Sequence, residues 1–127
     1  MNGGTARPGL RAGEDAQGLS IDQVVVRLRG VLGARLVAYI GNVTKTSIVR
    51  AWAEGDDAPN PDNDCRLRTA LHALGILEEG IDPITISTWF QGMNPFLGDE
   101  SPARYIRNAV PGAADDVLVA ARSMLVS

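Results

Sequence analysis

Residues 83–103 constrain the fold most, because their turn-forming side chains predict two helices joined by a sharply bent loop. Asp82 is a suitable cap for the first helix. Pro83 suits its first helical position, where the N–H that proline lacks would be unpaired anyway. Gly92 is expected to end this helix, since glycine is the usual residue just beyond a helix C-terminus. The first helix therefore begins and ends within this stretch.

The loop that follows is predicted to be held by its own turn chemistry. Asn94 precedes Pro95, and proline disfavours a helical conformation in the residue before it. Phe96 and Leu97 are expected to anchor the loop in an apolar core. The Ser-Pro pair at 101–102 then combines a capping hydroxyl with a proline at the first position of the next helix. The loop should therefore pack as firmly as the helices that it joins.

Apolar residues recur at helical spacing through the rest of the chain, so the fold class is predicted to be all-α. Ser20 with Gln23 forms a capping-box pattern, while Gly33, Gly41 and Gly55 punctuate the next helices. Asp62 or Asp64 is expected to cap a longer helix, and Thr44 a shorter one. The apolar positions are Ile21, Val24, Val25, Leu28 and Leu32; Ile48, Val49 and Trp52; Leu67, Ala70, Leu71, Leu74 and Leu77; Ala103, Ile106 and Val110; and Val117, Leu118, Ala121, Met124 and Leu125.

Composition bounds the setting in which this chain works. Its 127 residues suit one domain or two small ones, and 45% hydrophobic residues can bury a core. No apolar run of about 18 residues is present, so no membrane span is expected. Residues 1–19 are rich in glycine and are expected to form a flexible arm. A single cysteine and the lack of an apolar signal segment favour a cytoplasmic protein.

Catalytic and metal-binding patterns are missing from the sequence. There is one histidine and one cysteine, with no paired ligand spacing and no glycine-rich phosphate loop. His72 is interpreted as a surface residue, and Cys65 as a small residue in a first helical turn. We therefore expect no enzyme activity, no metal and no cofactor.

The stretch from Trp89 onward resembles the toxin-binding domain of Xre/MbcA/ParS-type antitoxins. In that family a helix ends in Trp and an apolar residue, and Asn-Pro, an apolar residue, Leu, Gly and a Ser/Thr-Pro pair follow. An ordinary, well-capped helix–loop–helix is the alternative interpretation of the same residues. The matching positions here are Trp89, Phe90, Asn94, Pro95, Leu97, Gly98, Ser101 and Pro102.

Residues 36–55 resemble the helix-turn-helix of the same family, with an apolar helix, a glycine turn, a Ser/Thr cap, and then Trp and Gly. The distance from Gly41 to Trp52 is one or two residues longer than usual. A recognition helix needs polar donors for base edges and cations for phosphates near its N-terminus. The alternative is that this helix pair is only a scaffold. The candidate DNA-binding residues are Thr44, Lys45, Thr46, Ser47 and Arg50.

The resemblance implies a fold of two parts: a helix-turn-helix-like domain over residues 20–79 and a small helical toxin-binding domain over residues 80–127. It implies an antitoxin that blocks a RES-domain toxin, an enzyme that degrades NAD, as a homodimer or a larger toxin–antitoxin assembly. In that family the C-terminal end enters the active-site cleft of the toxin. The implied toxin-binding residues are Trp89, Asn94, Pro95, Arg122, Met124, Leu125, Val126 and Ser127.

Charge asymmetry is consistent with two partners. Residues 20–53 carry a net charge of about +4 and residues 78–127 about −4, from counting side chains. The family resemblance implies operator DNA as the second partner, since such antitoxins can repress their own operon. Two other interpretations stay open: a free-standing helix-turn-helix regulator that uses residues 83–127 for dimerisation, and an adaptor that binds another protein with its C-terminal surface.

Overall fold

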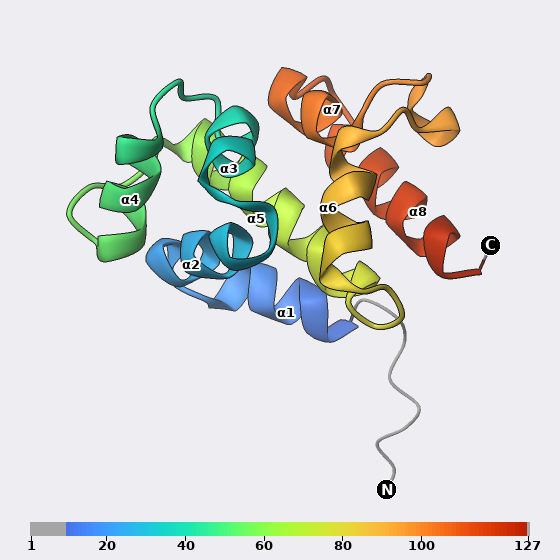
Figure 1. The fold of residues 1–127 in the computed structure, drawn as a ribbon, viewed down its shortest axis with the longest axis horizontal. Coiled ribbons are helices and arrows are strands. Elements are labelled where there is room, and N and C mark those ends of the chain that lie inside the picture. Colours follow the sequence, from blue (N-terminus) through green and yellow to red (C-terminus); the bar gives the residue numbers. More distant parts are fainter. Residues whose placement is uncertain (1–9, 127) are drawn as a thin grey trace, which may run out of the picture.

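The computed structural model describes residues 10–126, and within them the fold is all-α, as predicted. Eight α-helices and one short 3-10 helix are present in this range, with no strand (Figure 1). None of the described helices is long and apolar enough to cross a membrane. The elements are α1 (Leu10–Gly18), α2 (Ile21–Leu32), α3 (Ala34–Ile40), α4 (Thr46–Glu54), α5 (Pro61–Leu77), α6 (Pro83–Gln91), η2 (Pro95–Leu97), α7 (Pro102–Asn108) and α8 (Ala113–Val126).

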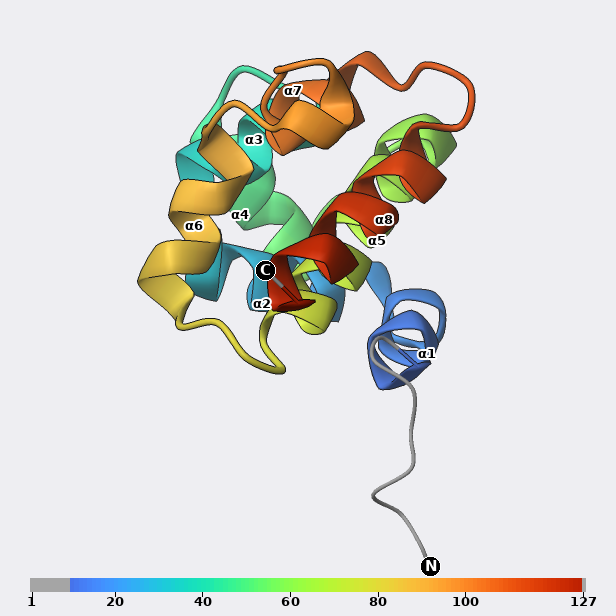
Figure 2. The ribbon, with the colours of Figure 1, turned by 90° about the vertical axis from the view of Figure 1, so that its right-hand side faces the viewer.

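Helix α5 is the central element, because α1, α2, α3, α7 and α8 all pack against it (Figures 1 and 2). It begins at Pro61, so the capping residue is Asn60, whose Oδ1 accepts a hydrogen bond from Asn63 N at 2.8 Å. The prediction that Asp62 or Asp64 caps this helix is therefore wrong. Proline prefers the first helical position, so the helix begins at Pro61 and the cap falls on the residue before it, Asn60.

One continuous core joins the N-terminal and C-terminal halves of the chain. The predicted stripe on α5 is buried as expected, and Ala73 and Ile76 on its other sides are buried too. Trp52 from α4 and Phe90 from α6 belong to the same cluster. Burying such a large apolar side chain contributes on the order of 2 kcal/mol. The predicted boundary near residue 80 separates two segments of the sequence, but residues of both segments pack into the same core.

Helix α1 corrects the expectation of a flexible arm over residues 1–19. It packs on α5 through the small residues Ala12 and Ala16, and a methyl group added at Gly75 would lie 2.5 Å from Ala12 Cβ. Helices that approach this closely need small side chains, which leave no stripe of large apolar residues in the sequence. Residues 1–9 of the predicted arm lie outside the described residues.

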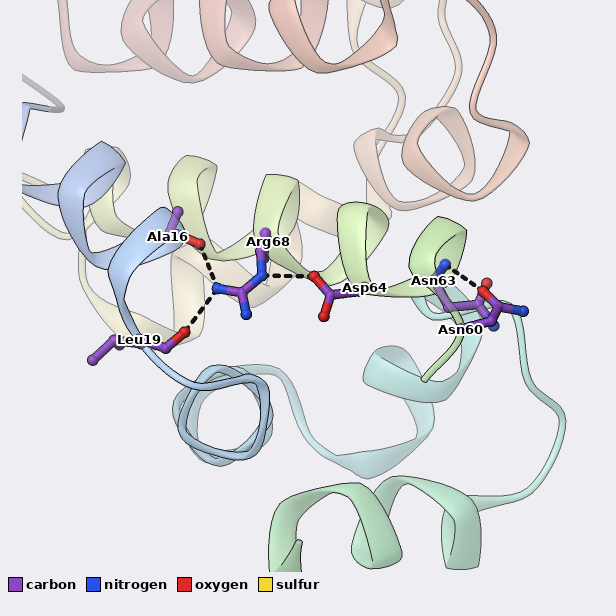
Figure 3. A network of polar contacts seen from close by, with 6 residues as sticks. All are labelled: Ala16, Leu19, Asn60, Asn63, Asp64 and Arg68. Carbon is purple, nitrogen blue, oxygen red and sulfur yellow. Dashed lines mark hydrogen bonds and ion pairs between the residues drawn. The ribbon is translucent and has the colours of Figure 1, made fainter. Parts of the chain in front are cut away.

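Arg68 on α5 holds the C-terminal end of α1 in place (Figure 3). Its guanidinium donates to the carbonyls of Ala16 at 2.9 Å and Leu19 at 2.8 Å, and to Asp64 at 2.6 Å. The last carbonyls of a helix have no partner within the helix, so a guanidinium is well suited to satisfy them. The contacts are specific to arginine, which offers several donors in a fixed plane.

The turn residues predicted from sequence mostly behave as expected. Gly33 and Gly55 end α2 and α4 with positive φ angles of 84° and 78°. The capping position of α4 is Lys45 rather than the predicted Thr44. Val110, expected on the apolar face of α7, lies beyond the end of that helix and is exposed, because Ala109 adopts a left-handed conformation and stops the helix first.

Candidate functional site

The loop between α6 and α7 is closed by Asn94, which is buried. Its side-chain oxygen accepts from Phe96 N at 3.0 Å, and its carbonyl accepts from Leu97 N and Asp99 N, both at 2.9 Å. Its own N–H donates to the carbonyl of Glu100 at 3.1 Å. Asn94 therefore shapes the loop from inside, while the exposed Pro95 begins η2.

Ser101 continues this loop into α7 as the sequence predicted. Its hydroxyl accepts from Arg104 N at 3.1 Å, and Pro102 takes the first helical position. Gly98 adopts φ 64°, a left-handed conformation that glycine tolerates without strain. These contacts fix the loop backbone at both ends.

Of the two residues expected to anchor the loop, Leu97 is buried and Phe96 is exposed. Leu97 enters the core, but Phe96 is 60% exposed, so its predicted anchoring role is wrong. The turn at η2 sends neighbouring side chains in different directions, so Leu97 joins the core cluster while Phe96 does not. Met93, just before the turn, is 82% exposed. Trp89 is half-buried and packs edge-to-face on Phe90, with ring centroids 5.0 Å apart.

Helix α8 lies beside η2 and carries exposed apolar residues of its own (Figure 2). Val119 is 52% exposed and Val126 is 87% exposed. Arg122 is three residues after Val119 and four before Val126, so these three side chains share one side of the helix. We refer to four exposed side chains, Met93 and Phe96 of the loop and Val119 and Val126 of α8, together as the apolar face, because the η2 loop and α8 are in contact.

The C-terminal residues implied to enter a toxin have different environments. Met124 and Leu125 are partly buried against the core, and Leu125 approaches Gly80 closely. Their side chains therefore stabilise the packing of α8 on the core and are only partly available to a partner. Arg122 and Val126 are exposed, and Ser127 lies outside the described residues.

A polar and basic surface occurs at the N-terminal end of α4. Thr44, Lys45, Thr46, Ser47 and Arg50 are all exposed there. Thr46 and Arg50 are one turn apart on the same side of the helix. The segment between α3 and α4 covers residues 41–45, in agreement with the long spacing noted in the sequence. We call these five side chains the α4 basic face.

Part of the basic excess in residues 20–53 is neutralised by the fold. Arg27 pairs with Asp15 at 3.3 Å and with Glu78 at 2.7 Å. Lys45 and Arg50, in contrast, have no ion-pair partner among residues 10–126. Arg29 and Arg35 also have no ion-pair partner among residues 10–126, so the unpaired positive charge of this segment includes but is not confined to α4.

Arg107 is a residue that sequence reasoning missed. It comes from α7, yet it donates to the carbonyl of Tyr39 on α3 at 2.6 Å and lies 4.7 Å from the centre of the Tyr39 ring. Its own carbonyl accepts from Arg66 Nε at 3.0 Å. No local pattern signals this contact, because the two residues are 68 positions apart.

The two residue types considered for catalysis or metal binding are placed apart from these faces. His72 is half-covered by α1, where a methyl group at Gly13 would lie 3.1 Å from its Nε2, so it is not the surface residue predicted. Cys65 is exposed beside a hollow of about 560 Å³ lined by α5 and the α7–α8 segment. Residues 10–126 contain no cluster of three or more metal-ligating side chains.

Three groups at or near the surface have shifted pKa values, and the largest cause of each shift is a hydrogen bond. Thr85 lowers the pKa of Asp82, and Ser20 lowers the pKa of Asp22, so both carboxylates are stabilised at the start of a helix. Tyr105 donates to Asp116 Oδ2 at 2.6 Å, which raises the pKa of the phenol. Asp82 lies at the start of α6 and Asp22 at the start of α2, and the Tyr105–Asp116 hydrogen bond joins α7 to α8.

Comparison with known proteins adds no relative: no family model, no curated protein and no solved structure matches this chain.

Proposed function

We propose that this chain is an antitoxin that binds a RES-type, NAD-degrading toxin through its C-terminal helices. The observation that carries the proposal is the apolar face, four exposed apolar side chains on two elements, the η2 loop and α8, that contact each other. Contiguous apolar patches on a protein surface commonly mark protein-binding sites. The sequence resemblance of residues 89–102 to antitoxins supplies the class of partner.

The loop geometry supports a preformed binding surface. Asn94 and Ser101 hold the loop backbone through hydrogen bonds. The loop that carries Met93 and Phe96 is therefore already ordered before a partner binds. Preorganisation reduces the entropy lost on association. Arg122, between Val119 and Val126, offers a guanidinium to an acidic group of the partner. Trp89 is proposed to border this surface from α6.

Co-expression tests this proposal directly. The chain is produced together with the product of the neighbouring gene, purified by affinity, and assayed for NAD consumption before and after its removal. We expect a stable complex in which NAD consumption is silent, and activity once the chain is removed. Absence of a complex, with a neighbour that is harmless alone, would rule the proposal out.

The α4 basic face favours a second function, which is binding of duplex DNA as a helix-turn-helix protein. Its five exposed side chains supply hydroxyl and cationic donors at the start of one helix. Three acidic residues limit this surface: Glu54 lies one turn after Arg50 on the same side of α4, and Asp56 and Asp57 follow the end of the helix, where they would repel phosphate. An antitoxin with this face would also repress its own operon. A free-standing regulator would need the face alone.

Truncation and substitution separate these functions. If removal of the residues after Ala121 abolishes function while Lys45→Ala with Arg50→Ala is silent, the antitoxin proposal stands. The opposite pattern favours the regulator. Since Met124 and Leu125 contact the core, the truncated chain must first be shown to remain folded by circular dichroism.

A further inference from the structure

Arg107 places a cation from the C-terminal helices at the end of α3 that leads into α4. The contact with the Tyr39 carbonyl occupies one guanidinium nitrogen, Nη1. Arginine has five N–H donors, so most of them are left for another acceptor. The Tyr39 ring under the guanidinium and the Arg66 contact to the Arg107 carbonyl restrict how this helix end and its side chain move.

Arg107 lines a shallow hollow together with residues of α3 and the α3–α4 segment. The hollow has a volume of about 270 Å³, and its walls include Ala38, Tyr39 and Val43. Besides Tyr39, its polar lining residues are two arginines and two threonines, and no Asp or Glu is among them. These four side chains are Arg35, Thr44, Thr46 and Arg107.

This lining matches the chemistry of a phosphate group. Guanidinium groups donate paired hydrogen bonds to phosphate oxygens, and hydroxyl groups are common phosphate contacts in protein–DNA complexes. Arg35 is exposed and has no ion-pair partner among the described residues. Arg50 continues the positive surface one helical turn beyond Thr46.

We propose that Arg107 contacts a phosphate of the DNA backbone, in a hollow that it shares with Arg35, Thr44 and Thr46. The DNA-binding surface is then composite, because α7 completes a face otherwise made by α3 and α4. The inference rests on the second proposed function, DNA binding, and adds a residue far outside the helix pair. Phosphate contacts position the protein on the duplex and carry no base specificity.

The test is a salt series of duplex-DNA binding by the full chain, using a fluorescent duplex that contains the chain's own promoter region. The variants are Arg107→Gln, which removes the charge, and Arg107→Lys, which keeps it. Arg104→Ala is the matched control, because Arg104 lies on the same helix and makes only a long, 3.9 Å ion pair with Glu100. Arg35→Ala probes the other side of the hollow.

The slope of log affinity against log salt reports the number of phosphates neutralised. Loss of one phosphate contact should reduce its magnitude by about 0.9. We expect this reduction for Arg107→Gln and for Arg35→Ala, and the wild-type slope for Arg107→Lys and Arg104→Ala. Thermal unfolding of each variant shows whether it is folded, and Arg35→Ala keeps the test valid if Arg107→Gln is not.

Two results overturn the inference, and they are distinguishable. If the wild-type chain binds DNA and the hollow variants keep its slope, Arg107 is not a phosphate contact, although DNA binding stands. If the wild-type chain binds no DNA at any salt concentration, the inference and the second function fail together. The toxin complex, measured separately, is unaffected by either result.

Discussion

The two ends of this molecule expose different chemistry on one shared core. At the start of α4 the exposed side chains are hydroxyls and cations, whereas the loop after α6 and the outer side of α8 expose large apolar groups. Of the nine large hydrophobic residues exposed within residues 10–126, six lie beyond residue 80. Net charge along the sequence therefore points only to the surface at α4. The apolar surface is found only from the exposure of its side chains in the structure.

The two surfaces should respond differently to salt. Binding to phosphates releases counterions and weakens steeply as salt rises. Burial of apolar area is largely insensitive to moderate salt and is strengthened by excluded salts such as sulfate. A shared core means that either surface can also be lost through unfolding, so every binding variant needs a stability measurement beside it.

The largest effect is expected from a charge placed in the apolar face. Phe96→Asp should weaken the toxin complex by ~30-fold or more, since loss of a central apolar contact costs about 2 kcal/mol. Because Phe96 is mostly exposed, the thermal stability should change little. Val26→Asp on α2, which is also about half exposed, is the matched control and should bind as the wild type does. Titration calorimetry with the purified partner measures the affinity of both variants. Equal losses of affinity would show that Phe96 has no special role in binding.

The next effect concerns the core that carries both faces. Gly75→Ala should destabilise the chain by about 1–3 kcal/mol, because its new methyl group would overlap Ala12 on α1. Gly30→Ala in α2 meets no atom within 4 Å and should instead stabilise by about 0.5–1 kcal/mol. Urea unfolding of both variants provides the measurement. Equal stabilities would show that α1 is not packed on α5 in solution.

A smaller effect separates the residues that shape the loop from those that touch the partner. Asn94→Ala removes the acceptor for Phe96 N and should destabilise by about 1 kcal/mol, with a moderate loss of toxin binding. Asn94→Asp keeps an acceptor oxygen and should recover most of both. Thermal unfolding and calorimetry are measured on the same samples. If Asn94 instead contacted the partner directly, Asn94→Ala would weaken binding without changing the stability.

The smallest effect is a pH dependence at the start of α6. The pKa of Asp82 is lowered below its ordinary value of 3.8 by its hydrogen bond with Thr85, so the folded state favours the carboxylate. Its contribution to stability is present above that value and is lost as pH falls through the lowered pKa. The stability difference between wild type and Asp82→Asn should therefore be constant above about pH 5 and shrink as the pH falls from there through the lowered pKa. A constant difference across urea titrations in this range would contradict the assignment.

Local chemistry explains what could be predicted from the sequence. Gly33, Gly55 and Ser101 act at their own positions, where the residue type alone determines the backbone conformation or the hydrogen bond. The apolar stripe of α5 was equally readable, because helical spacing is a property of the chain itself. The all-α fold follows from these features together.

Tertiary contacts explain what could not be predicted. Helix α1 packs through two alanines on Gly75, a contact between small residues that no apolar periodicity signals. Phe96 and Leu97 are adjacent in sequence, and only the direction of the η2 turn decides which of them is buried. The place of Arg107 beside Tyr39 depends on how α7 crosses α3.

If the two faces are separable, variants of each should affect only one of the two proposed partners, and a paired titration measures this. Phe96→Asp and the double variant Lys45→Ala with Arg50→Ala are each titrated with the purified toxin and with duplex DNA. We predict that Phe96→Asp loses the toxin and keeps DNA, while the double variant loses DNA and keeps the toxin. A folded variant that loses both partners, or two variants that lose neither, would contradict this separation.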